Sequence, residues 1–526
     1  MLSADARRFA LWTLGSFACT ALGVGLQSPT PALAWLLSPC TLCAWQAASR
    51  RWPRLLLLFL TQTVATAFAF RGALAAPGVS AVAAQSCLLA FCACIWLMLA
   101  LPHALLAAFL RAGVAPGLAP VVFACAWSAV WLAIDASPVG SFANPAATQS
   151  PWRVLTQSCA LLGIHGLLFL MSWPASIFAV AVAKALPPRQ LRLHAVLFAM
   201  ALACALLYGT QRLRSEAAAE AHPCGDVMSP PLRVSCLLRS WDGAGPEEDL
   251  WERTAVRVSA GDALVMWSET ALSVAQSEEA ALLSRAASIA SAGSSSLLVS
   301  YDMRLRGGGS ANKVALLRPG SPSNHNHSSS SQALLAFQYS KAHPVPLVEA
   351  GTCAGDGRLR FADTPAFGLV SAAVCFDLDF PHLLRQAGAA RAALVLQSAQ
   401  NWGGPAFAAR HFAGNSLRCV ENGLTLLRCG SDGVSGAVSP YGQVLARQVT
   451  GSDGTVLMEL PRSPTCTRVD TVFATARGYA FAWACAAATA AAVLSVAWAA
   501  RKAGHEHASA VASCELSSIK GCENSG

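Results

Sequence analysis

The sequence predicts a multi-pass α-helical membrane domain, followed by an α/β layered domain and a C-terminal transmembrane helix. Hydrophobic residues make up 54% of the 526 residues and charged residues only 12%, whereas about a quarter of the residues in an ordinary globular domain are charged. The apolar residues form runs of bilayer length, and one long central stretch lacks such runs. These observations exclude a purely cytosolic enzyme, and they exclude disorder for the bulk of the chain.

A membrane-spanning helix requires about 20 mostly apolar residues. Eight runs approach this length, near residues 9–26, 32–48, 54–70, 83–101, 116–134, 155–183, 191–209 and 478–500. The first run resembles a signal peptide in one respect, because Ala32-Leu33-Ala34 has the pattern of a cleavage site. Six further runs follow before any soluble block, which favours a retained helix.

Positively charged residues mark alternate loops between these runs. They are Arg7, Arg8, Arg50, Arg51, Arg54, Arg111, Lys184, Arg189, Arg192, Arg501 and Lys502. Because such loops stay on the cytoplasmic side, both termini are predicted to be cytoplasmic and the segment after Tyr208 to be periplasmic or lumenal. The net charge of +9 is spread around the apolar runs rather than clustered, so no nucleic-acid partner is predicted.

The chain divides into four predicted parts. Residues 1–214 form a membrane domain of about seven helices, 215–470 a soluble domain, 471–502 the C-terminal transmembrane helix and 503–526 a polar, disordered tail. In the soluble domain, short apolar runs predict strands at 232–237, 263–267, 296–301, 314–317, 334–337, 368–375, 393–397, 424–428 and 455–460. Helix-like stretches at 278–292 and 381–390 separate some of them, which is typical of an α/β layered domain.

Two further features of the soluble domain concern its compartment. Residues 321–331 have the composition of a flexible loop, and they contain a possible glycosylation sequon, Asn326-His327-Ser328. The domain holds seven of the 19 cysteines: Cys224, Cys236, Cys353, Cys375, Cys419, Cys429 and Cys466. In an oxidising compartment one thiol stays free if the other six pair. No Cys-x-x-Cys pair occurs among them, so a zinc site is not predicted.

Two candidate catalytic side chains follow predicted strands. Glu269 comes just after the strand at 263–267, and α/β sites usually lie at the carboxyl ends of strands. Partial burial would raise the pKa of such a carboxyl and suit it to act as a general base. Lys341 is one of only two lysines in the soluble domain, which suggests a need for a compact ammonium. The prolines that follow it fix an extended path that can hold Lys341 and Glu349 in one pocket.

A third candidate is Cys375, which ends the strand at 368–375 before Pro381 opens a helix. The N-terminus of that helix and a nearby ammonium can lower the pKa of such a thiol. Each of the three residues, taken alone, is more commonly structural. Together, a Glu, a Lys and a Cys supply a base, an oxyanion stabiliser and a nucleophile.

In this order the three residues resemble the Glu–Lys–Cys triad of the nitrilase, or carbon–nitrogen hydrolase, superfamily, which implies an αββα sandwich. With membrane spans on both sides of it, the chain resembles the apolipoprotein N-acyltransferase family over roughly residues 5–500. The matching elements are Trp267-Ser268-Glu269-Thr270-Ala271, the stretch from Tyr339 to Glu349, and Cys375-Phe376-Asp377.

The match departs from the family pattern at a few positions. Ser268 replaces a proline, Pro344 and Val348 stand where leucine and glycine are usual, and Phe376-Asp377 replaces Tyr-Glu. Weaker similarities extend over residues 137–141 and 161–166 and over Asn401-Trp402-Gly403.

The resemblance implies a ping-pong acyl transfer. Glu269 would take the proton of Cys375, while Lys341 and a backbone N–H near Phe376 would hold the oxyanion. Glu349 would orient Lys341 or assist proton movement, and Asp377 is a further supporting residue.

The implied acyl donor is a membrane phospholipid, and the implied acceptor is the N-terminal cysteine of an apolipoprotein or another amine. Neither a metal nor another cofactor is implied. One alternative is a membrane-anchored nitrilase-type amidohydrolase, which would pass its thioester to water. Another is a transporter or scaffold without catalysis, which the scarcity of ionisable residues in the spans disfavours.

Overall fold

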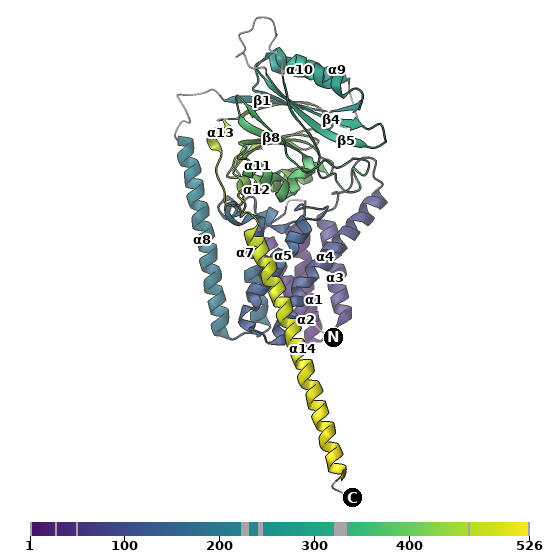
Figure 1. Cartoon of the computed structure of the whole chain (residues 1–526), viewed down its shortest axis with the longest axis vertical. Helices are drawn as coiled ribbons and strands as arrows, with labels where there is room; N and C mark the ends of the chain where they lie inside the picture. Colours follow the sequence, from purple (N-terminus) through teal and green to yellow (C-terminus); the bar gives the residue numbers. More distant parts are fainter. Residues whose placement is uncertain are drawn as a thin grey trace.

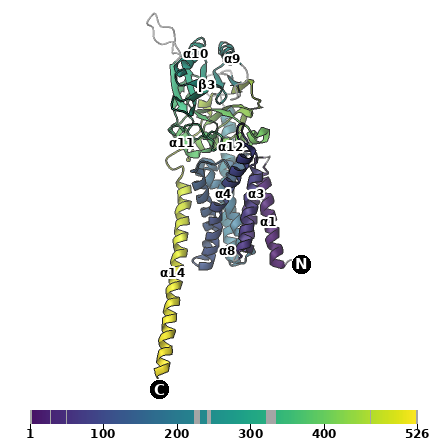
Figure 2. The same ribbon diagram turned by 90° about the vertical axis from the view of Figure 1, so that its right-hand side faces the viewer.

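The computed structural model describes residues 3–26, 29–48, 51–221, 231–239, 246–319, 334–460 and 463–523. A bundle of helices and a domain built on two β-sheets are stacked along the long axis of the molecule (Figure 1, Figure 2). The long helices of the bundle are α1 (Ala4–Gly23), α2 (Pro31–Ala48), α3 (Trp52–Ala69), α4 (Ala81–Ala112), α5 (Ala119–Asp135), α7 (Cys159–Val182), α8 (Pro188–Ala221) and α14 (Ala480–Glu523). Each of the eight predicted spans coincides with one of them. Shorter turns are η1 (Pro116–Leu118), η2 (Pro145–Gln149) and α6 (Arg153–Thr156).

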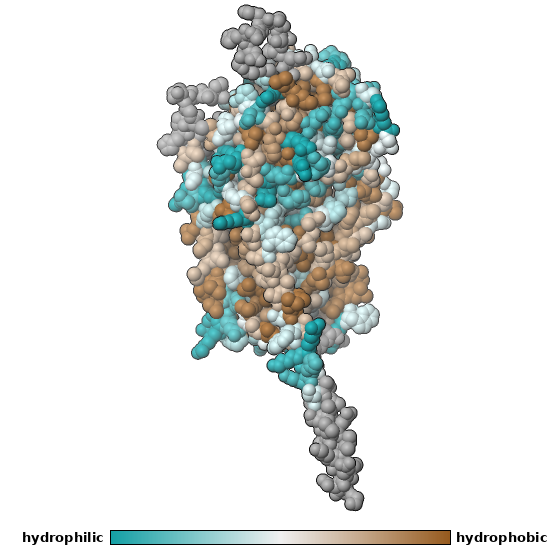
Figure 3. Space-filling view, in the orientation of Figure 1, coloured by the Kyte–Doolittle hydropathy of each residue, from teal (hydrophilic) through white to brown (hydrophobic). Residues whose placement is uncertain are grey.

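Six helices of the described part are long and apolar enough to cross a membrane: Trp52–Ala69, Ala81–Ala112, Pro116–Asp135, Cys159–Val182, Pro188–Ala219 and Ala480–Glu506. Brown, hydrophobic side chains are prominent on the visible face of the bundle, with hydrophilic side chains at its lower end (Figure 3). The predicted multi-pass helical part is therefore confirmed.

Helices α1 and α2 are not among these six, but polar side chains join them to the bundle. The hydroxyl groups of Ser16 and Thr41 lie 2.5 Å apart, and the Thr20 hydroxyl donates to the Gln62 side chain at 2.7 Å. Hydrogen bonds of this kind hold helices together where no water competes for them. The two helices thus belong to the bundle by packing as well as by position.

Helix α7 is interrupted at Gly163, where φ is 65° and ψ is −174°. A Cβ atom at this position would lie 2.4 Å from the ring of Phe473, so only glycine fits. The interruption frees the backbone N–H of Ile164, which donates a 2.8 Å hydrogen bond to Oε1 of Glu421 in the sheet domain. A break in a membrane helix is therefore used to attach the sheet domain to the bundle.

The sheet domain is a sandwich of two mixed sheets between two pairs of helices. One sheet has the strand order β13-β1-β2-β4-β5-β6 with β3 paired to β4, and the other has the order β12-β11-β10-β9-β8-β7. Helices α9 (Glu247–Ser259) and α10 (Glu279–Ser291) lie on the first sheet. Helices α11 (Pro381–Ala389) and α12 (Gly404–Asn422) lie between the second sheet and the bundle (Figure 1). This αββα arrangement confirms the predicted fold class.

The strands of the first sheet are β1 (Leu232–Leu238), β2 (Leu264–Trp267), β3 (Leu272–Ala275), β4 (Ser296–Arg304), β5 (Ser310–Arg318), β6 (Leu334–Ser340) and β13 (Gly454–Leu460). Those of the second are β7 (Phe361–Thr364), β8 (Gly368–Val374), β9 (Leu394–Gln400), β10 (Thr425–Ser431), β11 (Val434–Val438) and β12 (Val444–Val449). Short elements η3 (Cys375–Asp379) and α13 (Pro464–Thr467) complete the domain. All nine predicted strands are present, whereas β3, β7, β11 and β12 were not predicted.

A disulfide joins Cys236 of β1 to Cys429 of β10, with their Cα atoms 5.3 Å apart, and so links the two sheets through the core. Cys466 is also disulfide-bonded. Among the described cysteines of the domain, Cys353, Cys375 and Cys419 are free. The expectation of a single free thiol is therefore wrong, because Cys353 is exposed while Cys419 is buried on α12, and these two cannot pair.

Further predictions concern the C-terminal tail, the loop at 321–331 and Cys224. The C-terminal helix was expected to end near residue 502 before a disordered tail, but α14 continues to Glu523. The helix therefore extends past its predicted end. The sequon at 326–328, the loop at 321–331 and Cys224 lie outside the described residues.

Candidate active site

Glu269, Lys341 and Glu349 meet in a buried cluster at the carboxyl ends of β2 and β6. The Nζ atom of Lys341 lies 2.8 Å from Oε1 of Glu269 and 2.6 Å from Oε2 of Glu349. The Lys341 side chain is only 1% exposed. A buried ammonium is tolerated only when it is paired, and the two carboxylates provide that pairing. The structure thus brings together three of the predicted site residues.

The Glu269 carboxylate is held by three donors on different elements. Besides Lys341, the backbone N–H of Gln400 donates to Oε2 at 2.8 Å, and Nδ2 of Asn312 donates to Oε1 at 2.8 Å. The next residue, Thr270, has a φ of +50°, a backbone conformation that is costly without glycine. The turn after β2 is therefore strained, and it aims Glu269 at the opposite sheet.

Cys375 begins the turn η3 directly after β8, as predicted. Its φ is +44°, so the nucleophile candidate also lies on a strained turn. The Cys375 thiol lies 3.5 Å from the carbonyl oxygen of Gln400, and the Cys375 carbonyl accepts a 2.8 Å hydrogen bond from the Gln397 amide. Gln400 thus contacts both Glu269 and Cys375 through its backbone, which couples the positions of the carboxylate and the sulfur.

The charges of this cluster act on each other strongly. Burial raises the pKa of the Cys375 thiol, the Glu269 carboxylate raises it further, and Lys341 and Arg428 only partly oppose this. The predicted lowering of this pKa is therefore wrong, because burial and the carboxylate outweigh the ammonium. Burial alone would lower the pKa of Lys341, but Glu269 and Glu349 hold it well above its usual value. The resting cluster contains a protonated thiol and a charged ammonium.

Asp377 fixes the turn that carries Cys375 relative to the loop that carries Lys341. Its fully buried carboxylate accepts hydrogen bonds from the Tyr339 hydroxyl at 2.8 Å, from the backbone N–H groups of Ala342 and His343 at 3.1 and 2.9 Å, and from that of Val374 at 3.1 Å. Because these donors come from both sides of the site, Asp377 acts as an anchor between them. His343 belongs to this anchor and stacks on Phe380.

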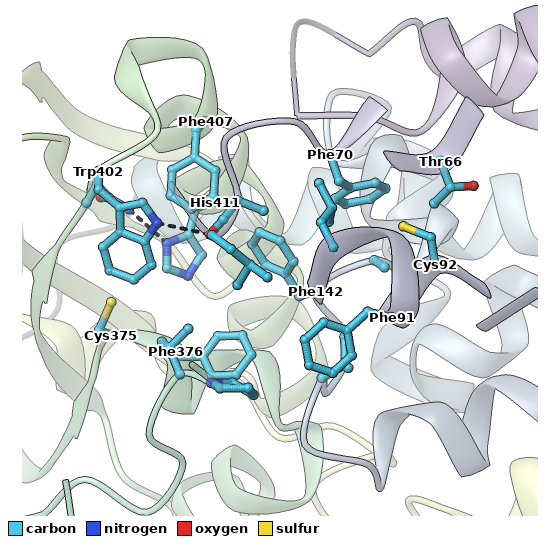
Figure 4. A pocket seen from close by; sticks show the side chains of 18 of the residues that line it. Thr66, Phe70, Phe91, Cys92, Phe142, Cys375, Phe376, Trp402, Phe407 and His411 are labelled. Atoms are coloured by element: carbon cyan, nitrogen blue, oxygen red, sulfur yellow. Dashed lines mark hydrogen bonds between the residues drawn. The ribbon is translucent and has the colours of Figure 1, made fainter. Parts of the chain in front are cut away.

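Phe376 and the Cys375 thiol face an apolar cavity between the sheet domain and the bundle. In Figure 4 the Cys375 sulfur lies at one side of this cavity, and Phe91 and Cys92 of α4 lie at the other. The bundle side is lined by Thr66, Phe70, Ala73, Leu74, Leu88, Phe91, Cys92, Ile95, Val139, Phe142 and Ala143. The sheet-domain side is lined by Val345, Pro346, Cys375, Phe376, Gln400, Asn401, Trp402, Phe407 and His411. The site is therefore joined to the interior of the membrane bundle.

A second buried cation, Arg428 of β10, lies close enough to interact with Cys375. Arg428 is fully buried and donates from its guanidinium to Asn401 Oδ1 at 2.7 Å and to Gln397 Oε1 at 3.2 Å. His411, which lines the cavity, contacts Asp379 at 3.1 Å. The positive charge of Arg428 opposes part of the rise in the pKa of the Cys375 thiol.

Sequence reasoning missed Asn312, Gln397, Gln400, His411 and Arg428. Four of them lie in strands: Asn312 in β5, Gln397 and Gln400 in β9, and Arg428 in β10. Their only signal was a polar residue within or at the end of a strand. Within the described residues, no group of three or more His, Cys, Asp or Glu side chains could hold a metal ion.

Comparisons with known proteins agree with the expected resemblance. The chain is 42% identical to an apolipoprotein N-acyltransferase of Gloeobacter violaceus over 85 residues, which are 16% of this chain and 16% of that relative. The resemblance to this family is thus confirmed over a short part of both proteins. No family model matches the chain.

Two solved structures align with part of the chain. An amidase from Nesterenkonia sp. is 22% identical with a TM-score of 0.35, covering 46% of this chain and 96% of the amidase. Saccharomyces cerevisiae Nit3, a member of branch 10 of the nitrilase superfamily, is 15% identical with a TM-score of 0.36, covering 45% of this chain and 93% of Nit3.

Proposed function

We propose that the protein is a membrane N-acyltransferase. It would move a fatty acyl chain from a phospholipid, through a thioester on Cys375, to an amine such as the N-terminal cysteine of an apolipoprotein. The observation that carries this proposal is the position of the Cys375 thiol. It interacts with Lys341 and Glu269 on one side and faces an apolar cavity lined by membrane helices on the other. The similarity to an apolipoprotein N-acyltransferase over 85 residues supports the reaction class.

In the first half-reaction, Glu269 takes the proton of the Cys375 thiol, and the sulfur attacks the ester carbonyl carbon of the phospholipid. Lys341 and the backbone N–H of Phe376 stabilise the oxyanion, and one such donor contributes about 3 kcal/mol. The bond between the acyl carbon and the ester oxygen then breaks. Glu269 returns the proton to that oxygen, so that lysophospholipid leaves and a thioester remains.

In the second half-reaction, the acceptor amine attacks the thioester carbonyl carbon. The amine transfers a proton to Glu269 as the amide forms, the C–S bond breaks, and Glu269 passes that proton to the Cys375 thiolate. Glu349 holds Lys341 in place through their 2.6 Å contact, and Asp377 holds the loop and the turn together. Neither half-reaction as written uses a metal or a nucleotide.

The apolar cavity gives the membrane helices a part in this reaction. Moving an acyl chain from lipid into water costs about 0.8 kcal/mol per methylene. A cavity that joins α3 and α4 to Cys375 lets the chain reach the sulfur without entering water. A single anchoring helix would not provide this, which supports an active role for the bundle.

The proposed arrangement in the membrane follows from the loop charges. Residues 1–214 and 471–502 lie in or at the membrane with both termini cytoplasmic, and the catalytic domain at 215–470 faces the periplasm or a lumen. The buried disulfide between Cys236 and Cys429 supports a periplasmic or lumenal catalytic domain, because disulfides persist in oxidising compartments.

Product analysis tests the proposal. The full chain is reconstituted in liposomes whose phospholipid carries a labelled acyl chain, and a lipopeptide with a free N-terminal amine is added. We expect the label in an amide of the lipopeptide, and no product from Cys375→Ala. Label found only in free fatty acid would instead support the membrane-anchored amidohydrolase. Full biological activity of Cys375→Ala would support a non-catalytic scaffold.

A further inference from the structure

A second pocket lies beside the buried cluster, on the side of Glu349 rather than on the side of the apolar cavity. Its wall includes Thr270, Ser273, Asp302, Asn312 and Glu349. Pro77, Val348 and two glycines also line it, and the two carboxylates and the amide distinguish it from the phenylalanine-rich cavity described above. It therefore suits a different part of a substrate.

The strand register places three of these side chains in one row. Ser273 of β3 pairs with Asp302 of β4, and Asp302 pairs with Asn312 of β5. Directly paired residues in neighbouring strands point to the same face with Cβ atoms about 5 Å apart. Glu349 continues this row, because its Oε1 accepts a 3.3 Å hydrogen bond from Nδ2 of Asn312.

The amide of Asn312 leaves an acceptor without a partner. Its Nδ2 donates to two carboxylates, Glu269 at 2.8 Å and Glu349 at 3.3 Å, so the orientation of the amide is fixed. Its Oδ1 accepts no hydrogen bond, although Asn312 is only 2% exposed. A buried acceptor without a donor is costly, and a ligand that donates hydrogen bonds would remove that cost.

The cations near Asp302 only partly compensate the negative charge of its carboxylate. Burial raises its pKa and Glu349 adds to the rise, whereas Ser310 and Arg304 lower it only in part. Arg304 is exposed, and its guanidinium donates a 3.4 Å hydrogen bond to Ser273. Glu349 itself is engaged by Lys341. The pocket therefore offers net negative charge together with the free acceptor of Asn312.

We propose that this pocket binds a primary ammonium group, with Asp302, Asn312 Oδ1 and Glu349 accepting its three N–H donors. This inference rests on the proposed function, which supplies two sources of such a group. One is the ethanolamine headgroup of the phospholipid donor, and the other is the amino terminus of the acceptor. The headgroup would stay in the pocket while its ester reacts at Cys375. The amino terminus would bind there as the ammonium, and it would lose a proton to a carboxylate of the pocket and move to the thioester carbon before it reacts.

The test compares Asp302→Asn with the unmodified full chain, and uses Asp363→Asn as the matched control. Asp363 is an exposed aspartate on β7 that lines neither of the two pockets described above. Asp302→Glu, which restores the charge, serves as a rescue variant. Thioester formation is followed by intact mass in liposomes of phosphatidylethanolamine or phosphatidylglycerol with the same acyl chains. Transfer to the lipopeptide is then measured from protein loaded with phosphatidylglycerol.

If the pocket takes the headgroup, Asp302→Asn slows thioester formation from phosphatidylethanolamine about tenfold and leaves phosphatidylglycerol unaffected. If it takes the acceptor, both thioesters form at the normal rate, and half-maximal transfer needs about tenfold more lipopeptide. In either case Asp302→Glu recovers part of the loss, which a folding defect would not show.

The proposal is overturned if Asp302→Asn behaves like Asp363→Asn in both half-reactions. It is also overturned if Asp302→Asn slows thioester formation from both phospholipids and transfer to the lipopeptide by the same factor. Absence of any thioester in the unmodified protein would overturn the proposed function, and this inference with it, before a variant is compared.

Discussion

The indole Nε1 of Trp402 donates a 2.9 Å hydrogen bond to the backbone carbonyl of Ala73. Trp402 lies in the loop after β9, and Ala73 lies in the segment between α3 and α4. Both residues line the apolar cavity, and Figure 4 shows Trp402 in its wall. The bond therefore joins the sheet domain to the bundle at the place where a lipid chain would pass.

Loss of this bond is expected to affect lipid substrates selectively. Trp402→Phe keeps an aromatic ring in the cavity but removes the donor, which costs about 1 kcal/mol. We expect thioester formation from phospholipid to slow about fivefold, while acylation by a short water-soluble ester is unchanged. Trp483→Phe, at an exposed position on α14, is the control. An equal loss with both esters would contradict a role at the lipid passage.

Glu269→Gln separates the role of the carboxylate as a base from its effect on the thiol. Since Glu269 raises the pKa of Cys375, its removal should lower that pKa and speed alkylation of Cys375 by a maleimide at pH 7. Acyl transfer should nevertheless fall by at least about a hundredfold, because the base is lost. Peptide mass mapping and product analysis measure the two effects. Retained transfer would show that Glu269 is not the base.

The pH dependence of Cys375 reactivity follows from the raised pKa of its thiol. Less thiolate is present at neutral pH than for an ordinary cysteine, so alkylation should be slow at pH 7. The rate should rise with pH and continue to rise above about pH 8.5, where an unperturbed thiol reaches half ionisation. Exposed Cys353 in the same sample controls for the reagent. A plateau below pH 8 would mean that the thiol pKa is lowered instead.

Asp377→Asn should weaken both the fold and the activity. An amide in place of the carboxylate presents N–H donors to the Tyr339 hydroxyl and to backbone N–H groups, which costs about 2 kcal/mol. We expect a lower Tm in thermal unfolding and a kcat reduced at least tenfold, since the loop of Lys341 loses its anchor. Asp363→Asn, at an exposed aspartate, should change neither. Unchanged Tm and kcat in Asp377→Asn would refute the anchoring role.

Gly163→Ala tests the attachment of the sheet domain to α7. Gly163 and Gly113 have the same φ of +65°, but a Cβ atom at Gly163 meets the Phe473 ring at 2.4 Å, whereas one at Gly113 meets nothing within 4 Å. The two positions differ in ψ, which is −174° at Gly163 and 11° at Gly113, so the difference between the alanine variants combines the greater backbone strain at Gly163 with the steric clash and the lost docking. We expect Gly163→Ala to be less stable by about 2 kcal/mol than Gly113→Ala. Equal Tm values would show that the break in α7 is not needed.

The fold could be predicted where the sequence carries long or buried apolar runs. Such runs form the eight long helices and the nine strands that were predicted, among them β8 and β9. In contrast, β3 has only four residues and β12 is mostly exposed, so neither forms a continuous apolar run. Helix α12 begins with Gly404-Pro405, which reads as a loop, although proline is favoured in the first turn of a helix.

The sequence predicts only part of the candidate site, because many of its contacts form between distant segments. Glu269, Lys341 and Cys375 each follow a strand that the sequence predicts, β2 and β6 in the first sheet and β8 in the second. The contacts of Asn312, Gln400 and Arg428 depend on tertiary packing between segments that are distant in the sequence. The pKa of Cys375 was mispredicted because its burial and the distance to a carboxylate are also properties of the fold.

The acylation state of one sulfur atom tests the central claim most directly. The full chain is incubated in phospholipid liposomes without acceptor, quenched in acid, and its peptides are analysed by mass spectrometry. We predict that the peptide containing Cys375 gains the mass of a fatty acyl chain, that hydroxylamine removes it, and that addition of the amine acceptor depletes it. A Cys375 peptide that stays unmodified while lipid is consumed would contradict the account.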